Sequence, residues 1–222
     1  MSFLRSHVFA ILLIVALAGV TAGLYPNLPD PVPTHWSLSG KPDGFTPKPW
    51  GAFVMPLAMT AIYLILLALP KISPRGFAMD RFAETWGTVR GFVMLFLFFV
   101  GVIALLAAAG EPIPMDRAML VPMGLLLALL GNFMGKFTRN FFVGIRTPWT
   151  LASEEVWLRT HRLGGKVFVV VGLAVAAAGL LGAPFALVLG VVMVAVLIPV
   201  VYSYVIYRRL EGFKNGEDRQ PG

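Results

Sequence analysis

LGGKVFVVVGLAVAAAGLLGAPFALVLGVVMVAVLIPVVYSYVIY, residues 163–207, is the stretch that decides the fold. Apart from Lys166 near its start it carries no charge, and Gly182 and Ala183 divide it into two apolar runs, residues 163–181 and 184–207. Each run has the roughly 17 to 25 residues that a helix needs to cross about 30 Å of hydrocarbon. The long stem of Lys166 can reach the interface. The sequence therefore predicts a tight hairpin of two membrane-spanning helices.

Four more apolar runs precede this hairpin, at residues 8–24, 51–69, 91–109 and 118–134. The whole chain is 58% hydrophobic and only 13% charged, with a mean hydropathy of +0.80, which excludes an ordinary soluble domain. We predict an all-α integral membrane protein with six transmembrane helices. The first run also has features of a secretory signal, but five further spans follow it.

Positive charges are distributed unevenly between alternate loops. The chain has 18 Lys and Arg against 11 Asp and Glu, a net charge of +7 and a pI near 10.1. Fifteen of these cations lie in the N-terminus, second loop, fourth loop and tail, whereas the other loops hold only Lys41, Lys48 and Arg117. By the positive-inside rule both termini are cytoplasmic. Since insertion accounts for the basic charge, we expect no direct nucleic-acid binding.

These boundaries divide the chain into four predicted segments. They are a two-helix unit at 1–70 with a proline-rich extracytoplasmic loop at 25–50, a basic cytoplasmic loop and third helix at 71–117, a module at 118–207 with a cytoplasmic loop at 135–165, and a disordered cytoplasmic tail at 208–222. The spans also hold the glycine pairs Gly19/Gly23 and Gly131/Gly135, whose spacing permits close helix packing. The amide of Asn132 is predicted to hydrogen-bond between helices.

The outer loop, residues 25–50, holds seven of the 17 prolines of the chain. Proline fixes φ and favours an extended preceding residue, so we expect an extended strip at 29–33 and a turn at Pro42-Asp43-Gly44, with positive φ at the glycine. Two interpretations stay open: an interfacial loop with its tryptophans at headgroup level, or a ligand-binding surface. The candidate binding residues are Pro33, Thr34, His35, Trp36, Gly40, Asp43 and Gly44. No second ligand stands at metal-binding distance from His35, so we expect no metal.

The fourth loop mixes large aromatic and polar residues with no helical or strand period. Beyond Pro148 we predict a short helix that is capped by Ser153 and ends at Gly164 and Gly165. On this helix Val156, Trp157, Thr160 and His161 share one face, which we expect to lie either on the membrane or on the bundle.

Arg146 in this loop has two open interpretations. It fixes the membrane orientation like the other cations, or its guanidinium holds a carboxylate, a lipid phosphate or a partner group. The candidate contacts with a cytoplasmic partner are Asn140, Gly144, Arg146, Thr147, Pro148, Trp149, Thr150, Trp157 and His161.

The run NFFVGIRTPWTLASEEVW at 140–157, followed by THRLGG at 160–165, resembles the signature of the SdpI family of bacterial membrane proteins. LPDPVPTHW at 28–36 and GKPDGF at 40–45 resemble a short domain of unknown function that often precedes it. This resemblance implies a six-helix protein of the bacterial plasma membrane that confers immunity against a secreted peptide toxin. It further implies a receptor that, with toxin bound, holds a cytoplasmic transcriptional repressor at the membrane.

Two other function classes were weighed against this one. A transporter or channel for small molecules or lipids is favoured by prolines in or beside the spans, but the spans contain essentially no Asp, Glu or His. An enzyme is disfavoured because no nucleophile, metal or phosphate-binding motif is present, and the chain has no cysteine. We therefore expect no catalytic residues and no cofactor, with membrane lipids, a peptide toxin and a repressor as partners.

Overall fold

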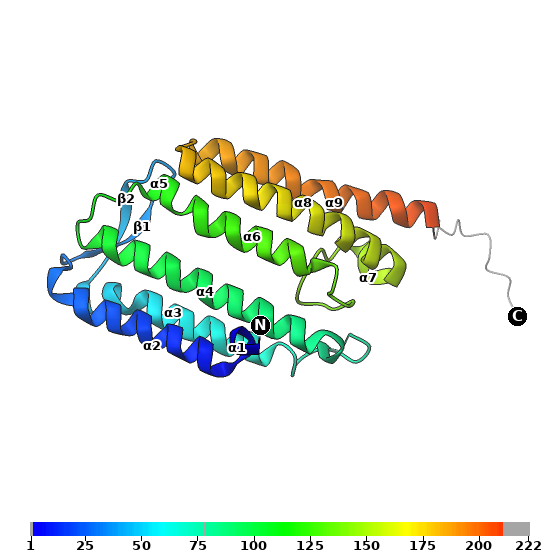
Figure 1. The fold of residues 1–222 in the computed structure, drawn as a ribbon, viewed down its shortest axis with the longest axis horizontal. Helices are drawn as coiled ribbons and strands as arrows, with labels where there is room; N and C mark the ends of the chain where they lie inside the picture. Colours follow the sequence, from blue (N-terminus) through cyan, green and yellow to red (C-terminus); the bar gives the residue numbers. More distant parts are fainter. Residues whose placement is uncertain (1, 78, 211–222) are drawn as a thin grey trace, which may run out of the picture.

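The chain folds as a bundle of six long helices with a β-hairpin at one end (Figure 1). The computed structural model describes residues 2–77 and 79–210. The long helices are α2 (His7–Leu24), α3 (Lys48–Ala68), α4 (Ala83–Ala108), α6 (Leu120–Met134), α8 (Glu154–Leu181) and α9 (Phe185–Leu210). The shorter elements are α1 (Ser2–Arg5), η1 (Tyr25–Asn27), β1 (Val32–Trp36), β2 (Pro42–Thr46), η2 (Met79–Phe82), α5 (Met115–Ala118) and α7 (Pro148–Ala152). The prediction of six helices long and apolar enough to cross a membrane is confirmed.

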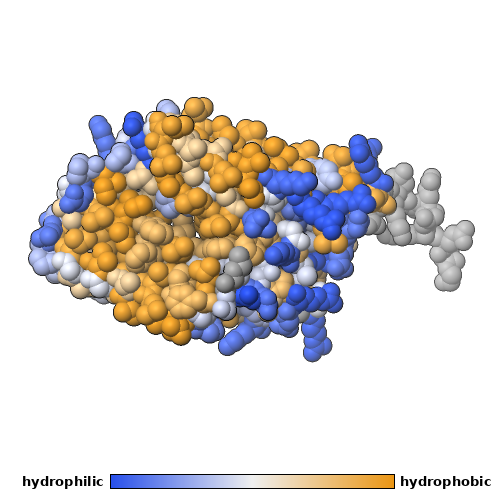
Figure 2. Space-filling view, in the orientation of Figure 1, coloured by the Kyte–Doolittle hydropathy of each residue, from blue (hydrophilic) through white to orange (hydrophobic). Residues whose placement is uncertain are grey.

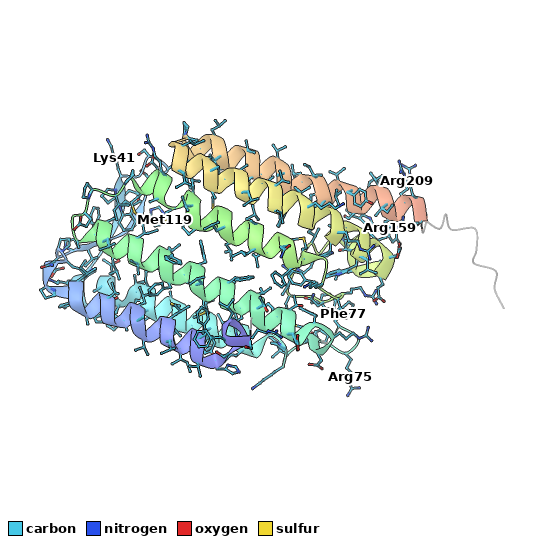
Figure 3. The ribbon with its side chains drawn as sticks, in the orientation of Figure 1. Lys41, Arg75, Phe77, Met119, Arg159 and Arg209 are labelled. Atoms are coloured by element: carbon cyan, nitrogen blue, oxygen red, sulfur yellow. The ribbon has the colours of Figure 1, made fainter. Side chains whose placement is uncertain are left out.

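An apolar surface covers the middle of the bundle, and hydrophilic residues gather at its two ends (Figure 2). We call the end with β1 and β2 the hairpin end, and the opposite end, with α1 and α7, the loop end (Figure 1). Lys41 lies at the hairpin end, whereas Arg75, Arg159 and Arg209 lie at the loop end (Figure 3). An apolar girdle between two polar caps is what a bilayer requires of a helical bundle.

Helices α6 and α8 contact each other backbone to backbone. Gly124 and Gly131 of α6 face Gly165 and Gly172 of α8, and within each helix these glycines are seven residues apart. A Cβ atom on Gly172 would lie 2.6 Å from the carbonyl oxygen of Gly124, and one on Gly131 would lie 2.8 Å from that of Gly165. Small residues allow such an approach, and a seven-residue repeat keeps the contact on one face of each helix.

This seam corrects part of the glycine prediction. Gly131 packs closely as expected, but a Cβ on Gly135 would meet only a side-chain atom at 3.9 Å, and Gly19 and Gly23 have nothing within 4 Å. Asn132 is exposed instead of bonded between helices. The glycine pairs that pack closely are seven residues apart and not four. A spacing of seven keeps both glycines facing the partner helix.

The first span is part of the bundle. Leu17 of α2 is fully buried and reaches the backbone of α4, where a Cβ on Gly101 would lie 2.8 Å from its Cδ2 atom. The preceding α1 is also held by α4, since Arg90 donates to the carbonyl oxygen of Arg5 at 2.8 Å and Arg5 pairs with Glu84 at 2.6 Å. These contacts favour a retained transmembrane helix over a cleaved signal.

The outer loop contains two strands, which the sequence analysis did not predict. β1 and β2 pair antiparallel, with Val32 opposite Thr46, and the turn between them lies at 37–41, where Gly40 has φ +76°. The predicted turn at Pro42-Asp43-Gly44 is wrong, because these residues form β2. Gly44 is needed for space instead, since a Cβ there would lie 2.8 Å from the Cβ of His35 across the ladder.

Helix α8 is one continuous helix of 28 residues, so the predicted end at Gly164 and Gly165 is wrong. Ser153 caps it as predicted, accepting a hydrogen bond from the Val156 amide. The two glycines do not stop the helix because they lie in close contact with α6 and the 135–153 loop. Helix α9 runs through residue 210, so residues 208–210 are helical; the rest of the predicted disordered tail lies outside the described residues.

The α6–α8 contact predicts a steep cost for adding a single methyl group. We expect Gly172→Ala to destabilise the protein by about 1–3 kcal/mol, because its Cβ must push two helix backbones apart. Gly190→Ala is the matched control, since nothing lies within 4 Å of that position in α9. Thermal unfolding of the purified protein in detergent measures both, and equal melting temperatures would contradict the seam.

Candidate functional site

A groove of about 390 Å³ opens at the hairpin end. Thr34, His35 and Trp36 of β1 line one side, and the turn residue Leu38 continues it. Its other walls come from α3, α4, α5 and the starts of α6 and α9, and they carry Met55, Val100, Ala104, Met115, Asp116, Met119 and Phe185. Methionine side chains adapt their shape to an apolar partner, and three of them line this groove.

A hydrogen bond between its two strands and a contact at its turn hold the hairpin in place. Thr34 and Thr46 hydroxyl oxygens lie 2.9 Å apart across the strands. The turn rests on α5, because a Cβ on Gly40 would lie 3.0 Å from the backbone nitrogen of Asp116. A wall that is fixed in this way presents Trp36 to the groove without ordering a loop first.

His35 and Asp43 form a polar pair on the exposed side of the hairpin. Their Nδ1 and Oδ1 atoms lie 2.5 Å apart, and the two side chains are 72% and 48% exposed. Of the seven residues predicted to bind a ligand outside, Thr34, His35 and Trp36 line the groove, and Gly40, Asp43 and Gly44 support the hairpin around them. Pro33 lines a smaller cavity of about 30 Å³ beside β1, with Trp36 at the boundary of both.

At the loop end, the side chain of Asn140 organises the 135–153 loop from within. It is fully buried, and its Oδ1 atom accepts hydrogen bonds from the amides of Phe142 and Val143, both at 2.8 Å. Its Nδ2 group donates to the carbonyl oxygens of Thr138, at 2.8 Å, and Val143. An asparagine with both ends satisfied fixes a turn that has no regular secondary structure.

His161 joins this loop to α8. Its Nε2 atom accepts a hydrogen bond from the amide of Ile145 at 3.0 Å, so the ring is neutral and Nδ1 donates to the Trp157 carbonyl at 2.8 Å. The imidazole stacks on Trp157 at a centroid distance of 3.9 Å. Gly144, with φ +99°, lies directly on the ring, where any Cβ would overlap Nε2. Of the two environments left open for this helix face, the structure shows the bundle, as Val156, Trp157, Thr160 and His161 are all buried.

Hydroxyl groups fasten the end of the loop to α7 and α9. Thr147 caps α7 in a reciprocal box with Thr150, whose hydroxyl also donates to the Ile145 carbonyl at 2.8 Å. The Thr147 hydroxyl oxygen lies 3.0 Å from that of Ser203 on α9. Next to this link, Trp149 packs edge-on against Tyr204 at 5.1 Å.

The nine residues predicted to contact an inner partner therefore divide by exposure. Five are buried and shape the loop: Asn140, Thr147, Thr150, Trp157 and His161. Gly144 and Trp149 are partly buried, while Arg146 and Pro148 are exposed. Arg146 also donates to the carbonyl oxygen of Phe141, which holds its stem across the loop. A partner at this end would touch the exposed pair and the edge of Trp149 first.

Sequence reasoning missed the residues that complete both sites. The groove walls Met55 and Phe185 come from α3 and α9, Met119 comes from the turn between α5 and α6, and no local spacing connects them. Ser203 is likewise distant from the loop in the sequence, and only the packing of α9 brings it next to Thr147. Among residues 2–77 and 79–210, no group of three or more histidine and acidic side chains could hold a metal ion.

Two known protein families match separate parts of this sequence. The SdpI/YfhL protein family matches residues 136–203, and a domain of unknown function (DUF1648) matches residues 12–60. The chain is similar to a Bacillus subtilis (strain 168) protein named Immunity protein SdpI, with 30% identity over 205 residues that cover 90% of this chain and 96% of the relative. No solved structure matches the chain.

The bond between His161 and the Ile145 amide predicts how the loop opens. We expect His161→Phe to destabilise the loop by about 1–3 kcal/mol, because the ring still stacks on Trp157 but leaves a buried amide without an acceptor. Limited trypsin digestion should then cut faster at Arg139 and Arg146. Arg162→Gln, a change at an exposed position of the same helix, serves as the control. Unchanged cleavage in the phenylalanine variant would contradict this role.

Proposed function

Because the chain belongs to the SdpI/YfhL protein family and is a multi-pass protein of the bacterial membrane, we propose that it is an immunity protein. It protects the cell that makes it against a secreted peptide toxin. The observation that carries this proposal is the similarity to Immunity protein SdpI along nearly the whole of both chains. Loss of the gene should therefore sensitise the cell to a peptide, and not change its use of a nutrient.

We place the toxin site in the groove at the hairpin end, on the outer side of the membrane. The distribution of cations supports this orientation, because fifteen of the eighteen Lys and Arg residues belong to the N-terminus, the second and fourth loops and the tail, and only three to the loops at the hairpin end. The apolar and methionine-rich walls suit apolar side chains of a membrane-active peptide. The carboxylate of Asp116 adds negative charge to the groove wall, which favours a peptide that carries positive charge.

Toxin binding is coupled to the cytoplasmic side through α9. Phe185 lines the groove at the first turn of this helix, and Ser203 and Tyr204 contact Thr147 and Trp149 near its other end. A small shift of one helix therefore reaches both sites. We propose that the surface of Arg146, Pro148 and Trp149 then holds a transcriptional repressor at the membrane.

The apolar cavity between α4 and α6 gives no support for transport of a polar solute. A cavity of about 260 Å³ between α4 and α6 is lined by apolar side chains alone. Carriers of polar solutes need polar or ionisable groups along their path.

Protection should depend on the groove and not on the hairpin surface in general. We expect Trp36→Ala to lower the toxin concentration that cells tolerate by about tenfold or more, since buried aromatic anchors dominate peptide binding. Phe45→Ala is the control, because Phe45 lies on β2, is 54% exposed and does not line the groove. The assay challenges deletion cells that express each variant with peptides secreted by the source organism and by its neighbours. Unchanged sensitivity of the deletion strain itself to every peptide would overturn the immunity role.

Retention of a cytoplasmic partner should depend on Arg146. We expect Arg146→Ala and Trp149→Ala to lose proteins that co-purify with the intact chain from toxin-treated cells. Arg162→Ala removes an exposed cation of α8 outside the proposed surface and should keep them. If both loop variants retain the same partners as the parent chain, the inner surface is assigned to the wrong residues.

A further inference from the structure

A second polar cavity, of about 180 Å³, lies at the loop end and plays no part in the proposed immunity function. Two parts of the chain that are distant in the sequence line it: the turn before η2 together with η2 itself, and the 135–153 loop together with the first residue of α8. The lining residues are Gly76, Arg81, Thr138, Arg139 and Glu154. Two guanidinium groups thus share one small space with a single carboxylate.

Arg139 is oriented before any ligand arrives. Its Nη1 group donates to the Leu151 carbonyl at 3.0 Å, and its guanidinium carbon lies 5.2 Å from the centre of the Phe77 ring. Phe77 in turn packs on Phe141 at 4.2 Å, near Arg75 at the loop end (Figure 3). A guanidinium has five N–H donors, so this arrangement leaves donors of Arg139 for a bound group.

Arg81 belongs to η2, and η2 packs on the 135–153 loop. The adjacent Phe82 is buried and contacts Phe137 with ring centres 5.8 Å apart. Across residues 2–77 and 79–210, neither Arg81 nor Arg139 forms an ion pair with a carboxylate. These two cations therefore lack the compensating charge that paired arginines have.

Thr138 supplies an independent sign of a missing partner. Its hydroxyl oxygen is buried and forms no hydrogen bond with any described residue, although Thr138 lines the cavity. Buried hydroxyl groups are nearly always bonded, and one without a partner calls for an explanation. An oxygen-rich ligand in the cavity would provide it.

We propose that this cavity binds a phosphate group. Arg139 and the neighbouring hydroxyl of Thr138 from one segment, with Arg81 from another, match an anion with three or more acceptor oxygens better than a planar carboxylate with two. Its place among the polar residues of the loop end suits the phosphate of an anionic lipid, and a soluble phosphate has the same chemistry. The charge of Glu154 opposes the anion and lowers its affinity.

The test measures phosphate binding by the purified full-length protein in detergent. Phosphatidylglycerol in one arm and inorganic phosphate in the other are titrated against thermal stability, with chloride at equal ionic strength as the reference. We expect Arg81→Gln to weaken binding by about tenfold or more, as loss of a charge-assisted hydrogen bond does. Glu154→Gln should tighten binding, because it removes the opposing charge. The arm with the lower Kd identifies the source of the phosphate.

Two further variants distinguish a site from a general effect of charge. Arg75→Gln removes an exposed cation from the turn before η2. Arg75 does not line the cavity, so this change should leave binding unchanged. Thr138→Val should keep or raise the stability of the ligand-free protein, since its hydroxyl has no partner, and yet weaken phosphate binding. No stabilisation in either arm, or an equal loss in Arg75→Gln and Arg81→Gln, would overturn the proposal.

Discussion

The backbone contact between α6 and α8 is the constraint on which the rest of the structure depends. Gly131 and Gly172 bring the two helices to within contact of their main chains, which no larger residue permits. Lipid tails are as apolar as leucine, so burial of apolar surface gives helices in a bilayer little reason to associate, and close packing must hold them. The seam continues into the loop, because a Cβ on Gly164 would lie 2.5 Å from the Cδ1 atom of Ile145.

Once α8 is held against α6, its side chains position the 135–153 loop. Trp157 donates its indole N–H to the Phe137 carbonyl at 2.7 Å, and His161 accepts from Ile145, so one helix face bonds two parts of the loop. The part of this loop before α7 needs no regular secondary structure, since the buried side chains of Asn140 and His161 satisfy part of its backbone. The result is a defined surface made from an irregular segment, which is the usual setting for recognition.

The sequence was sufficient for the spans and for the residues that share one face of α8, but not for contacts between distant segments. Hydropathy placed all six helices, because lipid selects long apolar runs whatever their neighbours. The helical spacing from Val156 to His161 gave the buried face of α8. By contrast, the end expected at Gly164 failed because glycine signals a cap only when no helix packs on it. Strand pairing failed as well, since the prolines of the outer loop hid the alternation that a hairpin shows. The groove and the polar cavity at the loop end could not be predicted, because each is lined by residues that are distant in the sequence and come together only in the folded chain.

The turn between α8 and α9 has a consequence for how the protein enters the membrane. Gly182, at φ +77°, closes α8 and leaves too little chain for either helix to insert alone. The pair must therefore cross the bilayer as one unit, with its free ends on the same side. Arg159, Arg162 and Lys166 flank one end, and Arg208 and Arg209 flank the other. By the positive-inside rule all five charges favour the same orientation of this helix pair. Loss of any one of them leaves four that still favour it.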